Sequence, residues 1–155
     1  MAGWGLTVLR VAVGIVFLAH GAQKLFGVFG GGGLTATSGY FTHLGLTPAY
    51  PLAVLWAVIE FVGGIAVFLG AWTRWAAIPL AIGMIVAIWK VHIANGFFIN
   101  WALTPGIAHG YEMNLVLIAA CVCLSLAGAG EFSIDKFLHR SAESALAGRH
   151  RIRSM

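Results

Sequence analysis

Four ionisable side chains lie in apolar stretches of this 155-residue sequence and could carry out chemistry there: His20, Glu60, His92 and Glu112. A fifth, Lys24, follows His20 by one helical turn on the same face. An isolated carboxylate in apolar surroundings must be protonated, paired or metal-bound. Two Glu and two His could bind a divalent metal ion, relay protons or hydrogen-bond the head of a quinone. The sequence contains no ExxH or HExxH spacing, so it does not indicate a metal site.

Glu60 is the most informative of these residues because its neighbours are apolar for most of ten positions on each side. The glycine pair at 63–64 would let a neighbouring helix approach closely. A purely structural ion pair with Lys24 or Lys90 is the alternative to a functional role, since such pairs also hold buried carboxylates. Lys90 and His92 are two positions apart and point to roughly opposite sides of a helix. We expect His92 to face the bundle and Lys90 to reach lipid head groups.

The elements that would position these residues are membrane helices. Hydrophobic residues make up 60% of the chain and charged residues 9%, with a mean hydropathy of +0.92. A soluble domain carries about a quarter charged residues, so the composition excludes an ordinary cytosolic enzyme, a disordered tail and a nucleic-acid binder. A bilayer core of ~30 Å takes ~20 apolar residues per helix. Four stretches meet this requirement, at about 6–26, 49–69, 75–93 and 111–127.

The sequence therefore predicts an all-α fold, an integral membrane four-helix bundle in residues 1–130 with both termini in the cytoplasm. Lys and Arg occur in the short loop 70–74 and in the basic tail 131–155, whereas loops 28–48 and 96–110 contain neither. In this orientation, the candidate side chains lie between the membrane midplane and its outer surface. The glycines at 30–33 are expected to form a flexible linker. The tail is expected either to form a short interfacial helix or to be a solvated, frayed end.

Several ordered motifs resemble the DoxX family of small bacterial and archaeal membrane proteins. They are Leu9-Arg10…Gly14…His20-Gly21…Lys24-Leu25, then Glu60-Phe61-Val62-Gly63-Gly64…Gly70-Ala71-Trp72-Thr73-Arg74-Trp75-Ala76-Ala77, then Met84, Ala87 and His92 with Gly96-Phe97-Phe98, and finally Tyr111-Glu112…Leu115 and Gly128-Ala129-Gly130…Ser133-Ile134-Asp135. The resemblance covers about residues 6–136 and implies a four-helix inner-membrane protein. It links the chain loosely to the quinone-reducing thiosulfate oxidoreductase subunit DoxD, and some DoxX-like proteins are associated with thiol and oxidative-stress defence. The two cysteines of this chain form no CxxC pair.

Three functions are open at this point. The first is a redox accessory or quinone-linked oxidoreductase subunit, with Glu60, His92 and His20 as proton relay, and these three with Lys24 and Glu112 binding a quinone or an anionic substrate. The second is a non-catalytic membrane anchor that assembles a partner enzyme, and the third is a carrier for a small solute or proton. The expected surroundings are the lipid bilayer of a bacterial or archaeal cytoplasmic membrane, with a partner oxidoreductase subunit or a second copy. No nucleic-acid partner is expected.

Overall fold

The computed structural model describes residues 2–141, and this part of the chain is helical without any strand. The main helices are α1 (Ala2–Phe26), α2 (Gly33–His43), α3 (Ala49–Leu69), α4 (Thr73–Ala87) and α5 (Glu112–Ala127). Beyond α4 the helix continues through a π-helical turn, Ile88–His92, and a 3-10 turn, Ile93–Asn95. Residues 134–141 add a last helical segment. The predicted all-α fold class is confirmed.

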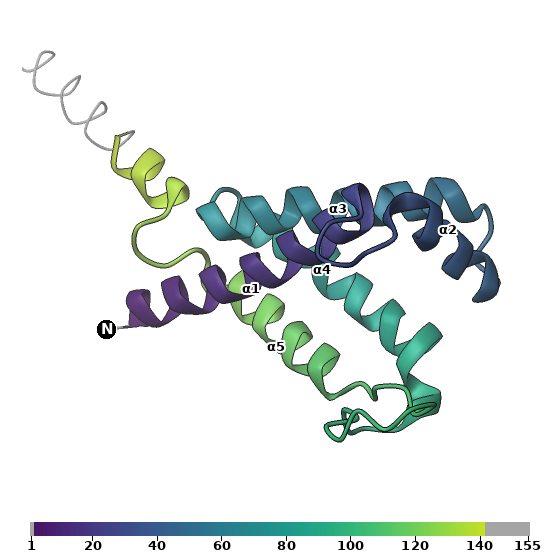
Figure 1. Cartoon of the computed structure of the whole chain (residues 1–155). Coiled ribbons are helices and arrows are strands. Elements are labelled where there is room, and N and C mark those ends of the chain that lie inside the picture. The colour runs from purple at the N-terminus through teal and green to yellow at the C-terminus, as the bar shows by residue number, and fades with distance from the viewer. Residues whose placement is uncertain (1, 142–155) are drawn as a thin grey trace, which may run out of the picture.

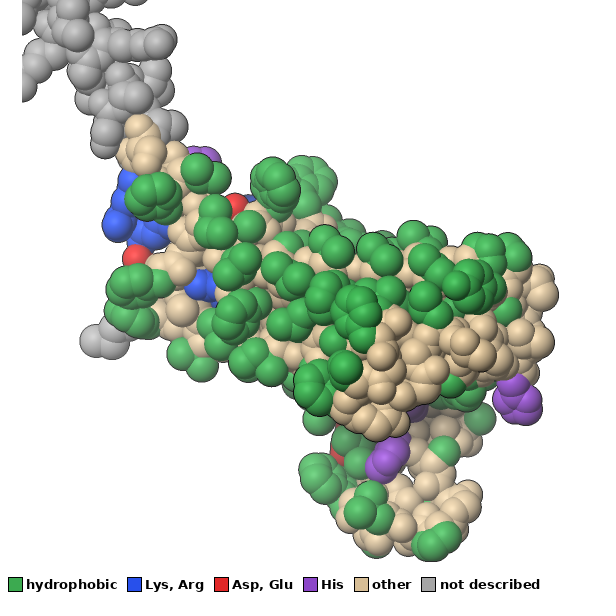
Figure 2. All heavy atoms as spheres, turned by 45° about the horizontal axis from the view of Figure 1, so that its top comes forward, with side chains coloured by type: hydrophobic (Ala, Val, Ile, Leu, Met, Phe, Trp, Pro, Cys, Tyr) green, Lys and Arg blue, Asp and Glu red, His purple; other side chains and the backbone are tan. Residues whose placement is uncertain are grey.

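Three helical segments are long and apolar enough to cross a membrane: Gly3–Phe26, Ala49–Leu69 and Thr73–Asn95. They coincide with three of the four predicted spans. The fourth prediction, 111–127, coincides with α5, which has 16 residues and reaches ~24 Å at ~1.5 Å per residue. The four-span count and the cytoplasmic position of both termini therefore stay predictions. Hydrophobic side chains cover much of the flank of the molecule (Figure 2).

The helices form two antiparallel pairs that diverge. The helix α1 packs mainly along α3, and α4 packs mainly along α5. Figure 1 shows the two pairs meeting at one end and spreading apart toward the other. We call the first end, with the start of α1 and residues 70–72 and 128–136, the closed end. The other, with α2 and residues 96–110, is the open end.

Backbone contact between α1 and α3 fixes the first pair. A Cβ added at Gly21 would lie 2.3 Å from the backbone nitrogen of Phe61, and one at Gly64 would lie 2.4 Å from that of Leu18. Only glycine fits at such distances, because real Cβ atoms do not approach so closely. The predicted role of Gly64 in close helix approach is thus confirmed. The same contact places Glu60 of α3 beside the end of α1.

The closed end is held by hydrogen bonds from a buried arginine and an aspartate. Arg10 is 3% exposed. Its guanidinium donates through Nη1 to the Phe68 carbonyl and through Nη2 to the Phe132 carbonyl, the latter at 2.7 Å. The Asp135 carboxylate accepts hydrogen bonds from the backbone nitrogens of Trp72, at 2.7 Å, and Thr73, at 3.1 Å. Asp135 therefore caps α4 from a distant part of the sequence.

The segment after α5 is attached to the bundle by the hydrogen bonds of Arg10 and Asp135 and by two backbone hydrogen bonds. Neither predicted form of the tail included such an attachment. The Glu131 nitrogen donates to the Gly3 carbonyl at 3.1 Å, and the Asp135 nitrogen donates to the Gly70 carbonyl at 2.9 Å. The predicted boundary at residue 130 thus falls next to a docked segment. Residues 142–155 of the predicted basic tail lie outside the described residues.

The expectation that residues 28–48 form only a loop is wrong, because α2 occupies most of this segment. The linker expected at 30–33 ends in Gly33, which has a φ of 65° and begins the helix. Few apolar residues mark α2, so the hydropathy pattern did not reveal it. Inside the helix, the Thr37 hydroxyl donates to the Gly33 carbonyl at 2.9 Å. The helix packs against α3 and, less extensively, against α1.

Candidate functional site

The divergence of the two helix pairs leaves a cavity of about 860 Å³ at the open end. All five helices and residues 96–110 contribute to its lining, and α2 covers it on one side. Most of the wall is apolar, from residues such as Phe17, Trp56 and Met84. Its volume is in the range of ~300–1,000 Å³ usual for small-molecule sites. The cavity is therefore the place where buried polar side chains could meet a ligand.

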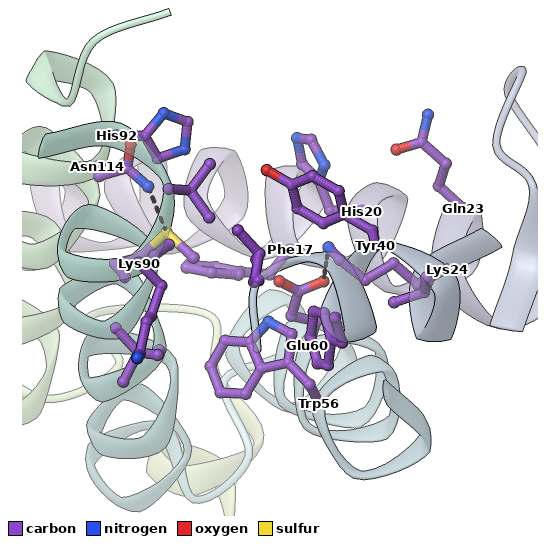
Figure 3. Close-up of a pocket in the computed structure, with 18 of the residues that line it drawn as sticks. Phe17, His20, Gln23, Lys24, Tyr40, Trp56, Glu60, Lys90, His92 and Asn114 are labelled. Atoms are coloured by element: carbon purple, nitrogen blue, oxygen red, sulfur yellow. Dashed lines mark hydrogen bonds and ion pairs between the residues drawn. The ribbon is translucent and has the colours of Figure 1, made fainter. Parts of the chain in front are cut away.

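One polar corner of the cavity is an ion pair between α1 and α3. The Lys24 ammonium donates to Oε2 of Glu60. The Glu60 side chain is 3% exposed and that of Lys24 is 24% exposed. Figure 3 shows the pair beside His20, which lines the cavity one turn before Lys24. The carboxylate predicted to need a partner thus has one, and the partner is Lys24 rather than Lys90.

A second polar group faces the cavity from α5 and the end of α4. His92 lines the cavity together with Asn114, whose Nδ2 donates to the Met84 sulfur at 3.5 Å. Figure 3 shows these two residues across the cavity from the Lys24–Glu60 pair. Lys90 also lines the cavity, and its ammonium lies 4.2 Å from the centroid of the Trp89 ring. Lys90 and His92 therefore both contribute to the cavity wall, although only His92 was expected to do so.

Hydrogen bonds define the tautomers of two histidines at this corner. Nδ1 of His92 lies 2.9 Å from the His109 carbonyl oxygen. Because a carbonyl can only accept, Nδ1 carries the proton, and Nε2 is the nitrogen that can take one up. Nδ1 of His109 accepts from the Asn100 nitrogen at 3.2 Å, so its Nε2 carries the proton in the neutral ring. His92 ends a π-helical turn, a feature frequent at functional sites.

Glu112 does not join the other candidates. Its Oε1 accepts from the Ile99 nitrogen at 3.1 Å, and its own nitrogen donates to the Phe97 carbonyl at 2.9 Å. Glu112 thus ties the loop 96–110 to the start of α5, and it does not line the cavity. In residues 2–141, no three His, Cys, Asp or Glu side chains are grouped so as to hold a metal ion. The expected set of two Glu and two His is therefore not assembled.

Several lining residues were not among the sequence candidates, notably Tyr40, His109, Asn114 and Trp56. Tyr40 points its hydroxyl toward the middle of the cavity from α2 (Figure 3). Ala36 and Tyr40 of α2, and Leu44 directly after it, line the cavity at spacings of four, which is one face of a helix. That spacing is the sequence signal that could have identified both α2 and Tyr40.

Comparison with known proteins is consistent with this architecture. The family model described as DoxX matches residues 5–93. An uncharacterized membrane protein of Mycobacterium tuberculosis is 34% identical over 86% of this chain and 81% of its own length. The Bacillus subtilis protein named "Putative oxidoreductase CatD" is 30% identical over 90% of this chain and 91% of its own. The inner membrane protein YqjF of Escherichia coli is 27% identical over 88% and 93%, respectively. No solved structure matches the chain.

Proposed function

This chain belongs to the DoxX family of membrane proteins, and we propose that it is a redox-associated subunit that binds a membrane quinone in its cavity. The observation that carries the proposal is the Lys24–Glu60 pair, a donor and a carboxylate at the wall of an apolar cavity. A structural ion pair needs no cavity beside it. Here the Lys24 side chain is 24% exposed, and an ammonium has three donors, so the hydrogen bond to Glu60 leaves capacity for a ligand.

The lining residues fit a quinone in both shape and chemistry. A quinone head is a flat apolar ring with an oxygen acceptor at each of two opposite edges, and when bound it supplies two-electron, two-proton carrier chemistry. Phe17 and Trp56 offer aromatic surface for a ring. Lys24 and His20 offer donors at one side of the cavity, and Asn114 offers a donor at the other. Tyr40 adds a hydroxyl from α2.

Within this proposal, the chain's own residues bind the head and move protons. Lys24 pairs with Glu60 and donates a further hydrogen bond to one ligand oxygen. Glu60 holds or releases a proton at its carboxylate, and His20 exchanges protons through its ring nitrogens beside the pair. On the opposite wall, Nε2 of His92 is the proton acceptor, because Nδ1 is held by the His109 carbonyl. The apolar wall excludes bulk water and strengthens each of these interactions.

In this proposal the electrons come from a partner oxidoreductase; the two free cysteines, Cys121 and Cys123, do not line the cavity. Support for a redox setting comes from the Bacillus subtilis relative, which is named "Putative oxidoreductase CatD". The Escherichia coli relative is named as an inner membrane protein. This name supports a bacterial cytoplasmic membrane as the location, and the distribution of Lys and Arg supports the proposed four spans with both termini inside. A second copy of the chain is a further candidate partner.

Purification with mild detergent tests the proposal directly. An organic extract of the protein, analysed by mass spectrometry, should contain a quinone, and the bound amount should fall at least tenfold in Lys24→Met. Glu131→Gln, which removes an exposed carboxylate at the closed end, is the matched control and should retain the ligand. Retention of quinone by Lys24→Met, or a wild-type protein that binds no added quinone, would contradict the proposal. A co-purifying enzyme without any quinone would instead support a non-catalytic assembly module.

A further inference from the structure

The cavity extends to the flank of the bundle between α3 and α4. Leu55 of α3 lines the cavity and is nevertheless 56% exposed. Ile82 and Val86 of α4 also line it and are 55% and 41% exposed. Both helices belong to segments long and apolar enough to cross a membrane. We call this gap, bordered by Leu55, Ile82 and Val86, the lateral opening, and its outer side faces the hydrocarbon layer.

An indole ring marks the end of the lateral opening toward the closed end. The Trp56 ring lies against Gly83, where an added Cβ would be 1.3 Å from Cη2 of the indole. One turn along α4 from Gly83 toward the closed end, α3 and α4 are in direct contact. A Cβ at Gly63 would meet the Leu80 side chain there at 3.3 Å. The gap between the helices therefore begins at Trp56 and continues toward Val86.

The Lys24–Glu60 pair is placed behind the lateral opening rather than in it. Its three bordering residues are aliphatic, whereas Lys24 and Glu60 lie deeper, on the α1 side of α3. Figure 3 shows Trp56 below this pair and Lys90 on the neighbouring helix. A ligand that occupies both regions must carry an apolar part for the gap and an oxygen-bearing part for the pair. A ligand head without an apolar chain leaves the lateral opening unfilled.

We propose that the ligand enters sideways from the bilayer through the lateral opening and keeps an apolar chain there after binding. Its head lies against Lys24 and Glu60. The ligand class is therefore a lipid-soluble ring compound that carries a long alkyl or isoprenoid chain. This inference rests on the proposed function. It adds the route by which the ligand enters and the place where its apolar chain lies.

The test compares two ligands and one blocked opening in lipid nanodiscs. The ligands are benzoquinones with the same ring, one bearing a ten-carbon chain and one bearing a methyl group in its place. Leu55→Trp narrows the lateral opening from α3, and Val86→Trp narrows it from α4. Val62→Trp is the matched control, because Val62 lies on the same face of α3, is 55% exposed and does not line the cavity. Binding is measured by quenching of tryptophan fluorescence.

The wild-type protein should bind both quinones. Leu55→Trp and Val86→Trp should weaken binding of the chain-bearing quinone at least tenfold and change binding of the methyl quinone less than threefold, while Val62→Trp should change neither. Unchanged binding of the chain-bearing quinone in both blocked variants would overturn the lateral route. Equal weakening of the two ligands would overturn the placement of the chain, since the chain would then not occupy the opening. A wild-type protein that binds neither quinone would overturn the proposed function as well.

Discussion

Removing either member of the Lys24–Glu60 pair should destabilise the protein, but not to the same extent. The Glu60 side chain is 3% exposed and the Lys24 side chain 24% exposed. In Lys24→Met the carboxylate stays buried without its partner, so the free energy of unfolding should fall by ~3–5 kcal/mol, the range for breaking a buried pair. In Glu60→Gln the amide oxygen can still accept a hydrogen bond from Lys24, whose side chain is the more exposed of the two. The loss should then be ~1.5–3 kcal/mol, the range for one hydrogen bond to a charged group.

The double variant Lys24→Met/Glu60→Gln should be more stable than Lys24→Met alone. It leaves no buried charge behind, so it avoids the unpaired carboxylate that makes Lys24→Met costly. Because the double variant should lose less than Lys24→Met alone, the coupling free energy should exceed the loss of Glu60→Gln, ~1.5–3 kcal/mol. Such a value would show that the two side chains interact directly in the folded protein.

The assay is unfolding by denaturant in detergent micelles, followed by far-UV circular dichroism. Lys136→Met is the control, because the exposed Lys136–Glu131 pair has side chains 35% and 34% exposed and such pairs contribute ~0–1 kcal/mol. The reasoning is refuted if Lys24→Met destabilises no more than Glu60→Gln. It is also refuted if the losses of the two single variants simply add in the double variant.

Three further predictions concern the rest of the bundle. Gly21→Ala should destabilise by ~1–3 kcal/mol, because its Cβ would meet the Phe61 nitrogen at 2.3 Å. Gly5→Ala, with nothing within 4 Å, should be neutral or stabilising by ~0.5–1 kcal/mol, and similar melting temperatures for both variants would contradict the packing. Asp135→Ala should lose ~0.5–2 kcal/mol as the cap of α4 is removed, and Asp135→Asn should lose less; equal losses in denaturant unfolding would show that the charge alone matters. The hydrogen bond from Lys136 lowers the pKa of Glu131, so Lys136→Gln should raise that pKa in a carboxyl carbon NMR titration, and an unchanged value would disprove the contact.

The membrane helices could be predicted from the sequence because hydropathy is a local property. Three long apolar stretches coincide with three helical segments that are long and apolar enough to cross a membrane, with boundaries within a few residues of the prediction. The helix α2 could not be found this way, since its residues are mostly small and polar. Its helical state depends on packing against α3 and α1, and tertiary contact of this kind commonly overrides weak propensity.

Depth along a span follows from position in the sequence, but rotation about the helix axis does not. Depth was enough to predict that His20, Lys24 and Glu60 lie in one half of the bundle, and they do line one cavity. Rotation explains why Glu112, predicted at a similar level, contacts the loop 96–110 instead. The cap that Asp135 provides to α4 joins positions 62 residues apart, and no local pattern in the sequence encodes such a pairing.

The motifs that carry the family resemblance divide between the two ends of the bundle, and this division explains why a cavity exists. Arg10, Thr73 and Asp135 belong to the motifs and build the closed end. His20 and Glu60 also belong to them and line the cavity. Because the closed end fastens all four long helices together and α1 contacts α3 along its length, the α4–α5 pair can separate only toward the open end. The polar side chains of the two helix pairs then line the cavity between the pairs instead of a packed core. A variant that loosens the closed end, such as Asp135→Ala, should therefore weaken ligand binding at the far end, although Asp135 touches no part of the cavity.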